Sequence, residues 1–186
     1  MRIIGGSRRG LKLAEVGEGD AAAHLRPTSD RVREAIFNLL INAHGNPVAG
    51  ARVLDLFAGT GALGLEALSR GAAEAVFVDD GAKALGLIRA NIAKMRVEAE
   101  SRVLRQNAAR LGANPGMGFG LVFLDPPYGK SLGEAALAAA CKGGWLAPHA
   151  MVVWEEGASV AVPDGFALAD QRKYGDTFVT LLRAPE

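Results

Sequence analysis

The chain has 186 residues, of which 49% are hydrophobic and 22% charged, and its formal net charge is +1. This length suits one well-buried domain, residues 1–186, and neither an apolar run of the roughly 20 residues of a membrane helix nor the apolar core of a signal peptide is present, so we expect a cytoplasmic protein with no membrane partner. A single cysteine, Cys141, excludes an internal disulfide, and scattered histidines without cysteine partners give no support to a zinc site, so we expect no metal.

Residues 1–33 are the basic part of the chain, with seven Lys or Arg against four Asp or Glu, whereas residues 34–186 hold fourteen against sixteen. Residues 2–13 place short apolar pieces on either side of a glycine- and arginine-rich run, Gly5 to Gly10, which predicts a β-hairpin with a flexible, exposed tip. We therefore divide the domain into a basic hairpin arm, residues 1–25, and a core, residues 26–186. A basic stretch is often only a solvated surface, but it can also contact phosphates.

Residues 28–40 predict an amphipathic helix, because cap-forming residues precede apolar residues at helical spacing. The apolar positions are Val32, Ala35, Ile36, Leu39 and Leu40. Arg31, Arg33 and Asn38 lie off this stripe, so we expect them either on a solvated face or turned towards a substrate.

From residue 50 onward, apolar strand patterns alternate with helical ones. The predicted strands are residues 51–57, 75–78, 103–104, 121–124 and 151–154, and the predicted helices are residues 62–70, 85–95 and 132–141. This alternation predicts an α/β fold with a parallel sheet and right-handed crossovers. Residues 168–174 and 177–183, on either side of Gly175-Asp176, predict a closing hairpin.

A glycine-rich turn follows the first predicted strand. Gly59-Thr60-Gly61-Ala62-Leu63-Gly64 matches the pattern G-x-G-x-x-G, and Asp79 follows the second strand. Glycines let a ligand approach the backbone, a helix start offers free N–H groups, and a carboxylate after the second strand accepts ribose hydroxyls, so NAD and S-adenosylmethionine both satisfy the pattern. Asp55, beside the turn, would repel a pyrophosphate but attract a methionine ammonium, which favours S-adenosylmethionine.

The fourth strand ends at Asp125-Pro126-Pro127-Tyr128. The prolines fix φ and remove two backbone donors, so Asp125 and Tyr128 are left at the carboxyl end of the strand, where open parallel sheets bind ligands. An ionised carboxylate only accepts hydrogen bonds and a ring stacks on flat partners, so this corner suits a planar group that carries an NH2, such as a nucleobase. An ordinary Pro-Pro turn with a solvated Asp is the alternative.

These motifs in combination resemble a known class of enzyme. Residues 53–61 with Asp125 to Tyr128 resemble the class I S-adenosylmethionine-dependent methyltransferases that modify exocyclic amines, and Arg26-Pro27-Thr28 with residues 33–38 and 61–71 resembles the RsmD family, which methylates guanine N2 in 16S ribosomal RNA. The resemblance covers nearly the whole chain, and it departs from the family at Asp79, where Glu is common. It implies a Rossmann-like class I methyltransferase fold, with a mostly parallel seven-stranded sheet, helices on both faces and an amino-terminal β-hairpin extension.

The resemblance also implies roles for individual residues. The cofactor, S-adenosyl-L-methionine, which leaves as S-adenosyl-L-homocysteine, would contact Asp55, Phe57, Gly59, Gly61, Asp79 and Asn107. The target amine and base would be held by Asp125, Pro126 and Tyr128. Phosphate contacts are expected from Arg8, Arg9, Lys12, Arg26, Arg31 and Arg33. The expected partner is 16S ribosomal RNA, free or within an assembled or assembling 30S subunit, and the protein is expected to be a monomer.

Three alternatives stay open. An adenine-N6 DNA methyltransferase shares the corner motif but normally has an added target-recognition region, for which this chain has little room. A glutamine-directed protein methyltransferase suits the chemistry, although the basic arm speaks against it. A non-catalytic or NAD-binding Rossmann module suits the glycine turn, and the corner motif alone does not distinguish guanine N2 from adenine N6.

Overall fold

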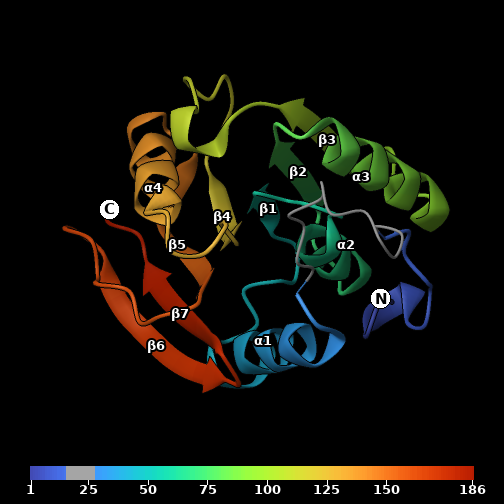
Figure 1. The fold of residues 1–186 in the computed structure, drawn as a ribbon, viewed down its shortest axis with the longest axis horizontal. Helices are drawn as coiled ribbons and strands as arrows, with labels where there is room; N and C mark the ends of the chain where they lie inside the picture. Colours follow the sequence, from blue (N-terminus) through green and yellow to red (C-terminus); the bar gives the residue numbers. More distant parts are fainter. Residues whose placement is uncertain (16–27) are drawn as a thin grey trace.

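The computed structural model describes residues 1–15 and 28–186, and all of its named strands form one seven-stranded sheet of order β3-β2-β1-β4-β5-β7-β6 (Figure 1). The strands are β1 (Arg52–Leu56), β2 (Glu74–Asp79), β3 (Ser101–Arg105), β4 (Phe119–Leu124), β5 (Leu146–Glu156), β6 (Ala167–Tyr174) and β7 (Thr177–Arg183). The first five run parallel, and β7 and β6 add an antiparallel hairpin at one end. The predicted parallel α/β sheet and its closing hairpin are confirmed.

Helices cover both faces of the sheet. The α-helices are α1 (Asp30–Ala43), α2 (Ala62–Ser69), α3 (Ala82–Met95) and α4 (Leu132–Lys142), and the short 3-10 helices are η1 (Gly6–Arg8) and η2 (Ala108–Arg110). Figure 1 shows α4 on one side of the sheet and α2 and α3 on the other. Successive side chains of each strand point to opposite faces of the sheet and pack in two apolar layers. Phe123 packs in the layer of α1, α2 and α3, and Trp154 packs in the layer of α4. Gly133 of α4 lies against Trp154, because a Cβ there would approach the indole to 2.4 Å.

Helix α1 begins where its sequence predicts, since the Ser29 hydroxyl accepts a hydrogen bond of 3.2 Å from the Val32 N–H. Its buried face differs from the predicted stripe. The buried residues are Arg33, Ile36, Phe37 and Leu40, which follow the spacing i, i+3, i+4, i+7 and so share one face. The interpretation of Arg33 as a residue off the apolar stripe is therefore wrong.

The amino-terminal arm is only partly a hairpin. In the described part of the arm, residues 1–15, a single antiparallel bridge joins Arg2 to Lys12, with hydrogen bonds from the Ile3 N–H to the Leu11 carbonyl and from the Gly10 N–H to the Ile3 carbonyl. The 3-10 helix η1 occupies the tip in place of a tight two-residue turn. The predicted hairpin of two extended strands is thus reduced to one bridge.

The tip of the arm is exposed, as predicted, but its backbone is fixed against α2. The Ser69 hydroxyl donates to the Gly5 carbonyl at 2.6 Å and accepts from the Arg8 N–H at 3.0 Å. Gly6 has a φ of +75°, and a Cβ there would lie 1.8 Å from the Ser69 carbonyl oxygen. The glycines of the tip therefore allow close packing, which replaces the predicted flexible tip.

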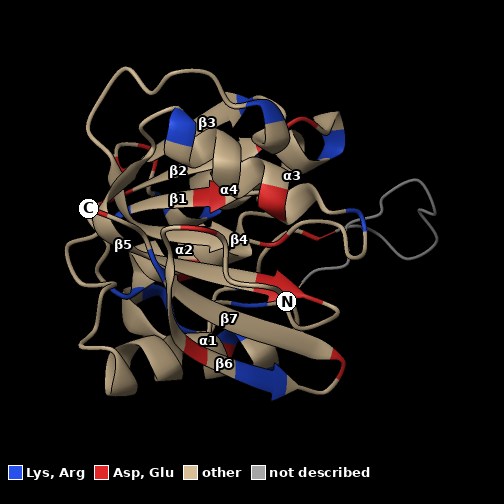
Figure 2. Cartoon of the chain, turned by 90° about the vertical axis from the view of Figure 1, so that its left-hand side faces the viewer, with Lys and Arg blue, Asp and Glu red and all other residues tan. Residues whose placement is uncertain are grey.

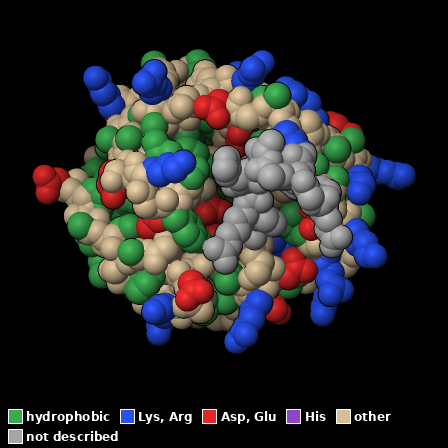
Figure 3. Space-filling model, in the orientation of Figure 1, with side chains coloured by type: hydrophobic (Ala, Val, Ile, Leu, Met, Phe, Trp, Pro, Cys, Tyr) green, Lys and Arg blue, Asp and Glu red, His purple; other side chains and the backbone are tan. Residues whose placement is uncertain are grey.

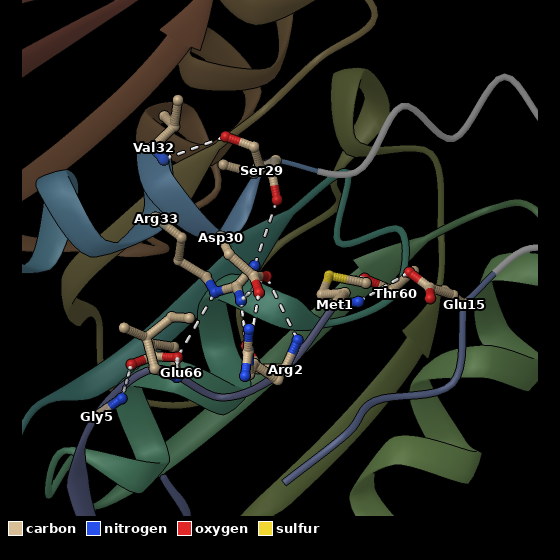
Figure 4. Close-up of polar contacts among 12 residues, drawn as sticks. Met1, Arg2, Gly5, Glu15, Ser29, Asp30, Val32, Arg33, Thr60 and Glu66 are labelled. Atoms are coloured by element: carbon tan, nitrogen blue, oxygen red, sulfur yellow. Dashed lines mark hydrogen bonds and ion pairs between the residues drawn. The ribbon is translucent and has the colours of Figure 1, made fainter. Parts of the chain in front are cut away.

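Glu66 of α2 ties the arm to the core (Figure 4). Its buried carboxylate accepts hydrogen bonds of 2.8 Å from the Ile4 and Gly5 N–H groups and 2.7 Å from Arg70 Nε. Arg33 Nε lies 3.5 Å from the same carboxylate, and both side chains are fully buried. A carboxylate with this many donors is well compensated for its burial.

Arg33 extends this network to α1 and to the start of the chain. Its guanidinium donates to the Asp30 carboxylate at 2.9 Å, to the Thr28 carbonyl at 3.3 Å and to the Arg2 carbonyl. Figure 4 shows Arg33 between Asp30 and Glu66.

Among the described residues, no helix combines the length and the apolar character that crossing a membrane requires.

Replacing the Glu66 carboxylate tests this network. We expect Glu66→Gln to lower the free energy of unfolding by about 3 kcal/mol, the lower end for breaking a buried ion pair, because the buried Arg33 then keeps only the partly exposed Asp30 as a counter-charge. Urea unfolding measures the change, with Glu98→Gln, a surface carboxylate, as the matched control expected to stay within about 0.5 kcal/mol of the wild type. Equal stability of the two variants would contradict the role of Glu66.

Candidate functional site

Four parallel strands end side by side at one edge of the sheet. Leu56 of β1 pairs with Val78 of β2 and with Leu124 of β4, and Leu124 pairs with Trp154 of β5. The next residues in this register are Asp79, Phe57, Asp125 and Glu155. Figure 3 shows acidic side chains in a hollow near the centre of this face and Lys and Arg side chains around its outline. The structure therefore brings the predicted carboxylates together.

The glycine turn lies between β1 and α2 and is fixed by Asp79. One Asp79 oxygen accepts a hydrogen bond of 2.9 Å from the Gly59 N–H, and the other accepts one of 2.9 Å from the Gly81 N–H, at the start of α3. Burial raises the pKa of Asp79. Gly61, with a φ of +79°, is the N-cap of α2, and it has no side chain to cap the helix. The first turn of α2 thus offers backbone N–H groups to a ligand.

Phe57 connects β1 to this turn in an unusual conformation. Its φ is +59°, in the left-handed region that a residue with a Cβ seldom adopts. Such conformations persist where the surrounding structure imposes them, and they cluster at ligand sites. The predicted cofactor contacts Phe57, Gly59, Gly61 and Asp79 all lie at this turn.

Asp55 lies beneath the turn and not on its rim. Its carboxylate is 1% exposed and accepts a hydrogen bond of 2.9 Å from the Gly64 N–H in the first turn of α2. Burial raises the pKa of Asp55 to about 8. A Cβ on Gly64 would approach Phe77 to 2.5 Å, so glycine is required for this packing. Asp55 therefore supports the start of α2, and its contact with a methionine ammonium stays a prediction.

Asn107 lies outside the sheet beyond β3, at the start of η2. Its side-chain oxygen accepts from the Ala109 N–H at 2.9 Å, and its amide nitrogen donates to the Asp80 carboxylate at 3.0 Å. Both polar atoms thus have partners within the chain. The contact of Asn107 with an adenine amine stays a prediction.

Asp125 shares its surroundings with Glu155, a residue that the sequence reasoning did not select. The Thr28 hydroxyl lies 3.1 Å from Asp125 Oδ2 and 2.8 Å from Glu155 Oε1. Burial and the nearby charge of Glu155 raise the pKa of Asp125 well above its usual range, and burial also raises the pKa of Glu155. The two carboxyl groups, of which Glu155 is buried and Asp125 partly exposed, therefore form one acidic pair that favours holding a proton.

Tyr128 follows Asp125 by three residues, at the same edge of the sheet. Its ring packs on the backbone of Gly157, where a Cβ would approach to 2.9 Å, and its hydroxyl lies 3.3 Å from the Thr177 hydroxyl. The side chain remains 38% exposed, while Pro126 is buried. Burial raises the pKa of Tyr128, so the phenol stays neutral. The ring is held in place and still accessible to a flat partner.

The predicted phosphate contacts fall into three groups. Arg8, Arg9, Lys12 and Arg31 are exposed, although Arg8 Nε also donates to the Met95 carbonyl at 3.0 Å. Arg33 is fully buried in the Glu66 network, so the prediction that it contacts phosphate is wrong. Arg26 lies outside the described residues.

A second basic residue, Lys173, lies near Arg31, and the sequence did not indicate this. It lines a cavity of about 570 Å³ together with Lys173 and Tyr174 of β6. Figure 2 shows the basic segment of β6 near its arrowhead, at the end of the sheet next to α1. No sequence signal connects Arg31 to Lys173, because only the closing hairpin brings β6 to α1.

Among the described residues, no group of three or more His, Cys, Asp or Glu side chains is arranged to hold a metal ion.

Comparison with known proteins places the chain in a family. The family model described as "Conserved hypothetical protein 95" matches residues 1–183. The chain belongs to this family. It is similar to the Ribosomal RNA small subunit methyltransferase D of Escherichia coli K12, with 39% identity over 94% of this chain and 85% of the relative. The protein of the same name from Haemophilus influenzae is 33% identical over 94% of this chain and 89% of the relative.

The chain is also similar to solved structures. The structure titled "Putative methyltransferase yhhF from Escherichia coli" superimposes with a TM-score of 0.83 at 36% identity, covering 100% of this chain and 98% of that one. The order of the strands and the antiparallel β7 agree with the predicted Rossmann-like class I methyltransferase fold, which is confirmed.

Two site residues escaped the sequence reasoning for different reasons. Glu155 follows the fifth predicted strand, so the rule that selected Asp79 and Asp125 at the carboxyl edge could have selected it as well. Thr28 carried only a helix-capping signal, and its contact with two carboxylates depends on how α1 packs against the sheet.

The raised pKa of Asp55 predicts a pH dependence of stability. A carboxyl group with a raised pKa in the folded state contributes stability that is fully present below its unfolded value of 3.8 and is lost as the pH rises through about 8. Asp55→Asn keeps an acceptor for Gly64 but has no such proton. We expect the unfolding free energy of Asp55→Asn, relative to the wild type, to rise between pH 4 and 8, by at most about 1.4 kcal/mol per pH unit. Parallel profiles in urea unfolding would contradict this origin of the shift.

Proposed function

We propose that the protein transfers a methyl group from S-adenosylmethionine to the exocyclic N2 amine of a guanine in the 16S ribosomal RNA of the small subunit. The names of its relatives support ribosomal RNA as the substrate. The observation that carries the proposal is the position of Asp125 and Tyr128 at the same sheet edge as the glycine turn. The guanine N2 target rests on the resemblance to the RsmD family.

The residues around the glycine turn fit S-adenosylmethionine, the cofactor of this methyltransferase class. The start of α2, where the N-cap residue Gly61 supplies no side-chain cap, suits the methionine carboxylate, because helix N-termini favour negative charge. Each Asp79 oxygen has one N–H donor and retains a second lone pair for a ribose hydroxyl. When bound, the cofactor supplies an electrophilic methyl group.

The Asp125 corner holds the target amine. Its carboxylate and the Pro126 carbonyl are acceptors that would each receive one N–H of the amine, which fixes the direction of the nitrogen lone pair. Orientation of this kind can supply up to about 7–11 kcal/mol of the barrier. The amine loses one proton in the reaction, and the carboxylate that accepts its N–H is in position to take it.

Tyr128 holds the base that carries the amine. A guanine must leave its stack in the RNA, which costs a few kcal/mol, and stacking on an aromatic ring returns roughly 1–3 kcal/mol. The ring suits this role because Gly157 and Thr177 fix its position while it stays accessible. Exposed Arg9, Lys12 and Arg31 would contact the phosphates of the RNA.

Removing the Asp125 carboxylate separates chemistry from cofactor binding. We expect Asp125→Ala to lower the rate of methyl transfer to small subunits by at least about 100-fold, because the amine is no longer oriented. Its affinity for S-adenosylhomocysteine, measured by calorimetry, should stay near that of the wild type, since the turn is untouched. The exposed Asp164→Ala is the matched control with wild-type transfer. Methyl transfer by Asp125→Ala at the wild-type rate would contradict the proposed role of Asp125 in orienting the amine.

The exposed basic residues Arg9, Lys12 and Arg31 predict an affinity for RNA that depends on the salt concentration. The logarithm of the binding constant should fall linearly with the logarithm of the salt concentration, and Arg9→Ala and Arg31→Ala should each reduce the slope by up to about 1. Arg102→Ala is the control, because Arg102 lines a cavity at the opposite, amino-terminal edge of the sheet. An affinity that does not change with salt would argue against phosphate contacts.

A further inference from the structure

Glu155 is a buried carboxylate with an unused acceptor at the centre of the site. It is 2% exposed and lies next to Asp125, because Leu124 pairs with Trp154 on the neighbouring strands. Glu155 Oε1 lies 2.8 Å from the Thr28 hydroxyl, whereas the buried Oε2 has no hydrogen-bond partner within residues 1–15 and 28–186. Arg33, whose charge acts on Glu155, directs its hydrogen bonds to Asp30 and to the carbonyls of Arg2 and Thr28.

Folding alone gives no reason for such a group. A buried acceptor without a donor is unfavourable by about 1–3 kcal/mol, and more when it is charged, so an apolar residue at this end of β5 would serve the core better. The Thr28 hydroxyl lies within 3.1 Å of both carboxylates but has one hydrogen, so it cannot satisfy both. When both carboxyl groups are ionised, the pair therefore lacks at least one donor among the described residues; a proton shared between the two acids, or an N–H group of a ligand, would supply it.

The Watson–Crick edge of guanine carries the donors that fit this arrangement. Guanine presents N1–H and N2–H side by side, which matches two adjacent carboxylates. Adenine presents a lone pair at N1 beside its N6 amine, so the second carboxylate would face another acceptor. Burial raises the pKa of both acids, and two N–H donors would favour the ionised form of the pair.

We propose that Glu155 accepts the N1–H of the target guanine while Asp125 accepts an N–H of its N2 amine, so that Glu155 selects guanine over adenine. This inference rests on the proposed function and adds the residue that identifies the base. The Thr28 hydroxyl marks, in the free protein, a donor position that the base would take over. A site built to accept an N–H discriminates strongly against an analogue that lacks it, because its buried acceptor is then left unpaired.

Base analogues test the inference on the full-length protein. After the modified position has been mapped, 16S RNA is assembled with either guanine or 2-aminopurine at that position. 2-Aminopurine keeps the 2-amine but has no hydrogen at N1. The wild type should methylate guanine with a kcat/KM about 10–100-fold above that for 2-aminopurine, the range for a hydrogen bond to a charged group.

The variant Glu155→Gln should reduce this ratio to within about threefold, since its amide can both donate and accept. Glu98→Gln, an exposed carboxylate, should keep the wild-type ratio. S-Adenosylhomocysteine affinity and urea unfolding of Glu155→Gln confirm that the change is confined to base recognition. A wild type that uses both bases equally would overturn the inference without any variant.

The outcomes separate the two proposals. Methylation of guanine N2 with the same base ratio in the wild type and Glu155→Gln would overturn the role of Glu155 and leave the proposed function standing. Methylation of adenine N6 by the wild type would overturn the proposed function and this inference together.

Discussion

The site depends on the common register of β2, β1, β4 and β5. Because Leu56, Val78, Leu124 and Trp154 are level with one another, the residues that follow them, Phe57, Asp79, Asp125 and Glu155, lie at the same edge of the sheet. A slip of one residue in any strand would turn its last side chain to the opposite face. The apolar layers on both faces fix this register. Partial or full burial of the carboxyl groups raises the pKa values of Asp79, Asp125 and Glu155, and the charge of Glu155 adds to the shift of Asp125.

Asn91 connects the glycine turn to the amino-terminal arm. Asn91 of α3 is fully buried, accepts from the Ala14 N–H at 2.6 Å and donates to the Thr60 carbonyl at 2.9 Å, so the arm packs against the glycine turn. Glu66 and Arg33 hold the other end of the arm on α2 and α1. Because these contacts fix the arm against α2, α3 and the glycine turn, the exposed basic residues of the arm have fixed positions relative to the site.

Most of the fold could be predicted from sequence, because the buried parallel strands are short apolar runs and each motif lies directly after one of them. The row of carboxylates followed from the rule that such strands end at one edge. Arg33 could not be placed in this way: the predicted apolar stripe left it off the buried face, and its burial depends on Glu66, whose position depends on the packing of α2. Asp55 was predicted at a ligand, and only the structure shows it holding the Gly64 N–H. The one-bridge arm likewise depends on Ser69, far away in sequence.

The chemical identity of the methylated atom tests the account most directly. Labelled S-adenosylmethionine would be incubated with the protein and with small ribosomal subunits, free 16S RNA or DNA, and the product digested to nucleosides and analysed by mass spectrometry. The account predicts that the label appears as N2-methylguanosine in ribosomal RNA, at one position, and that DNA receives none. Label found as N6-methyladenine, in DNA or in protein would contradict it.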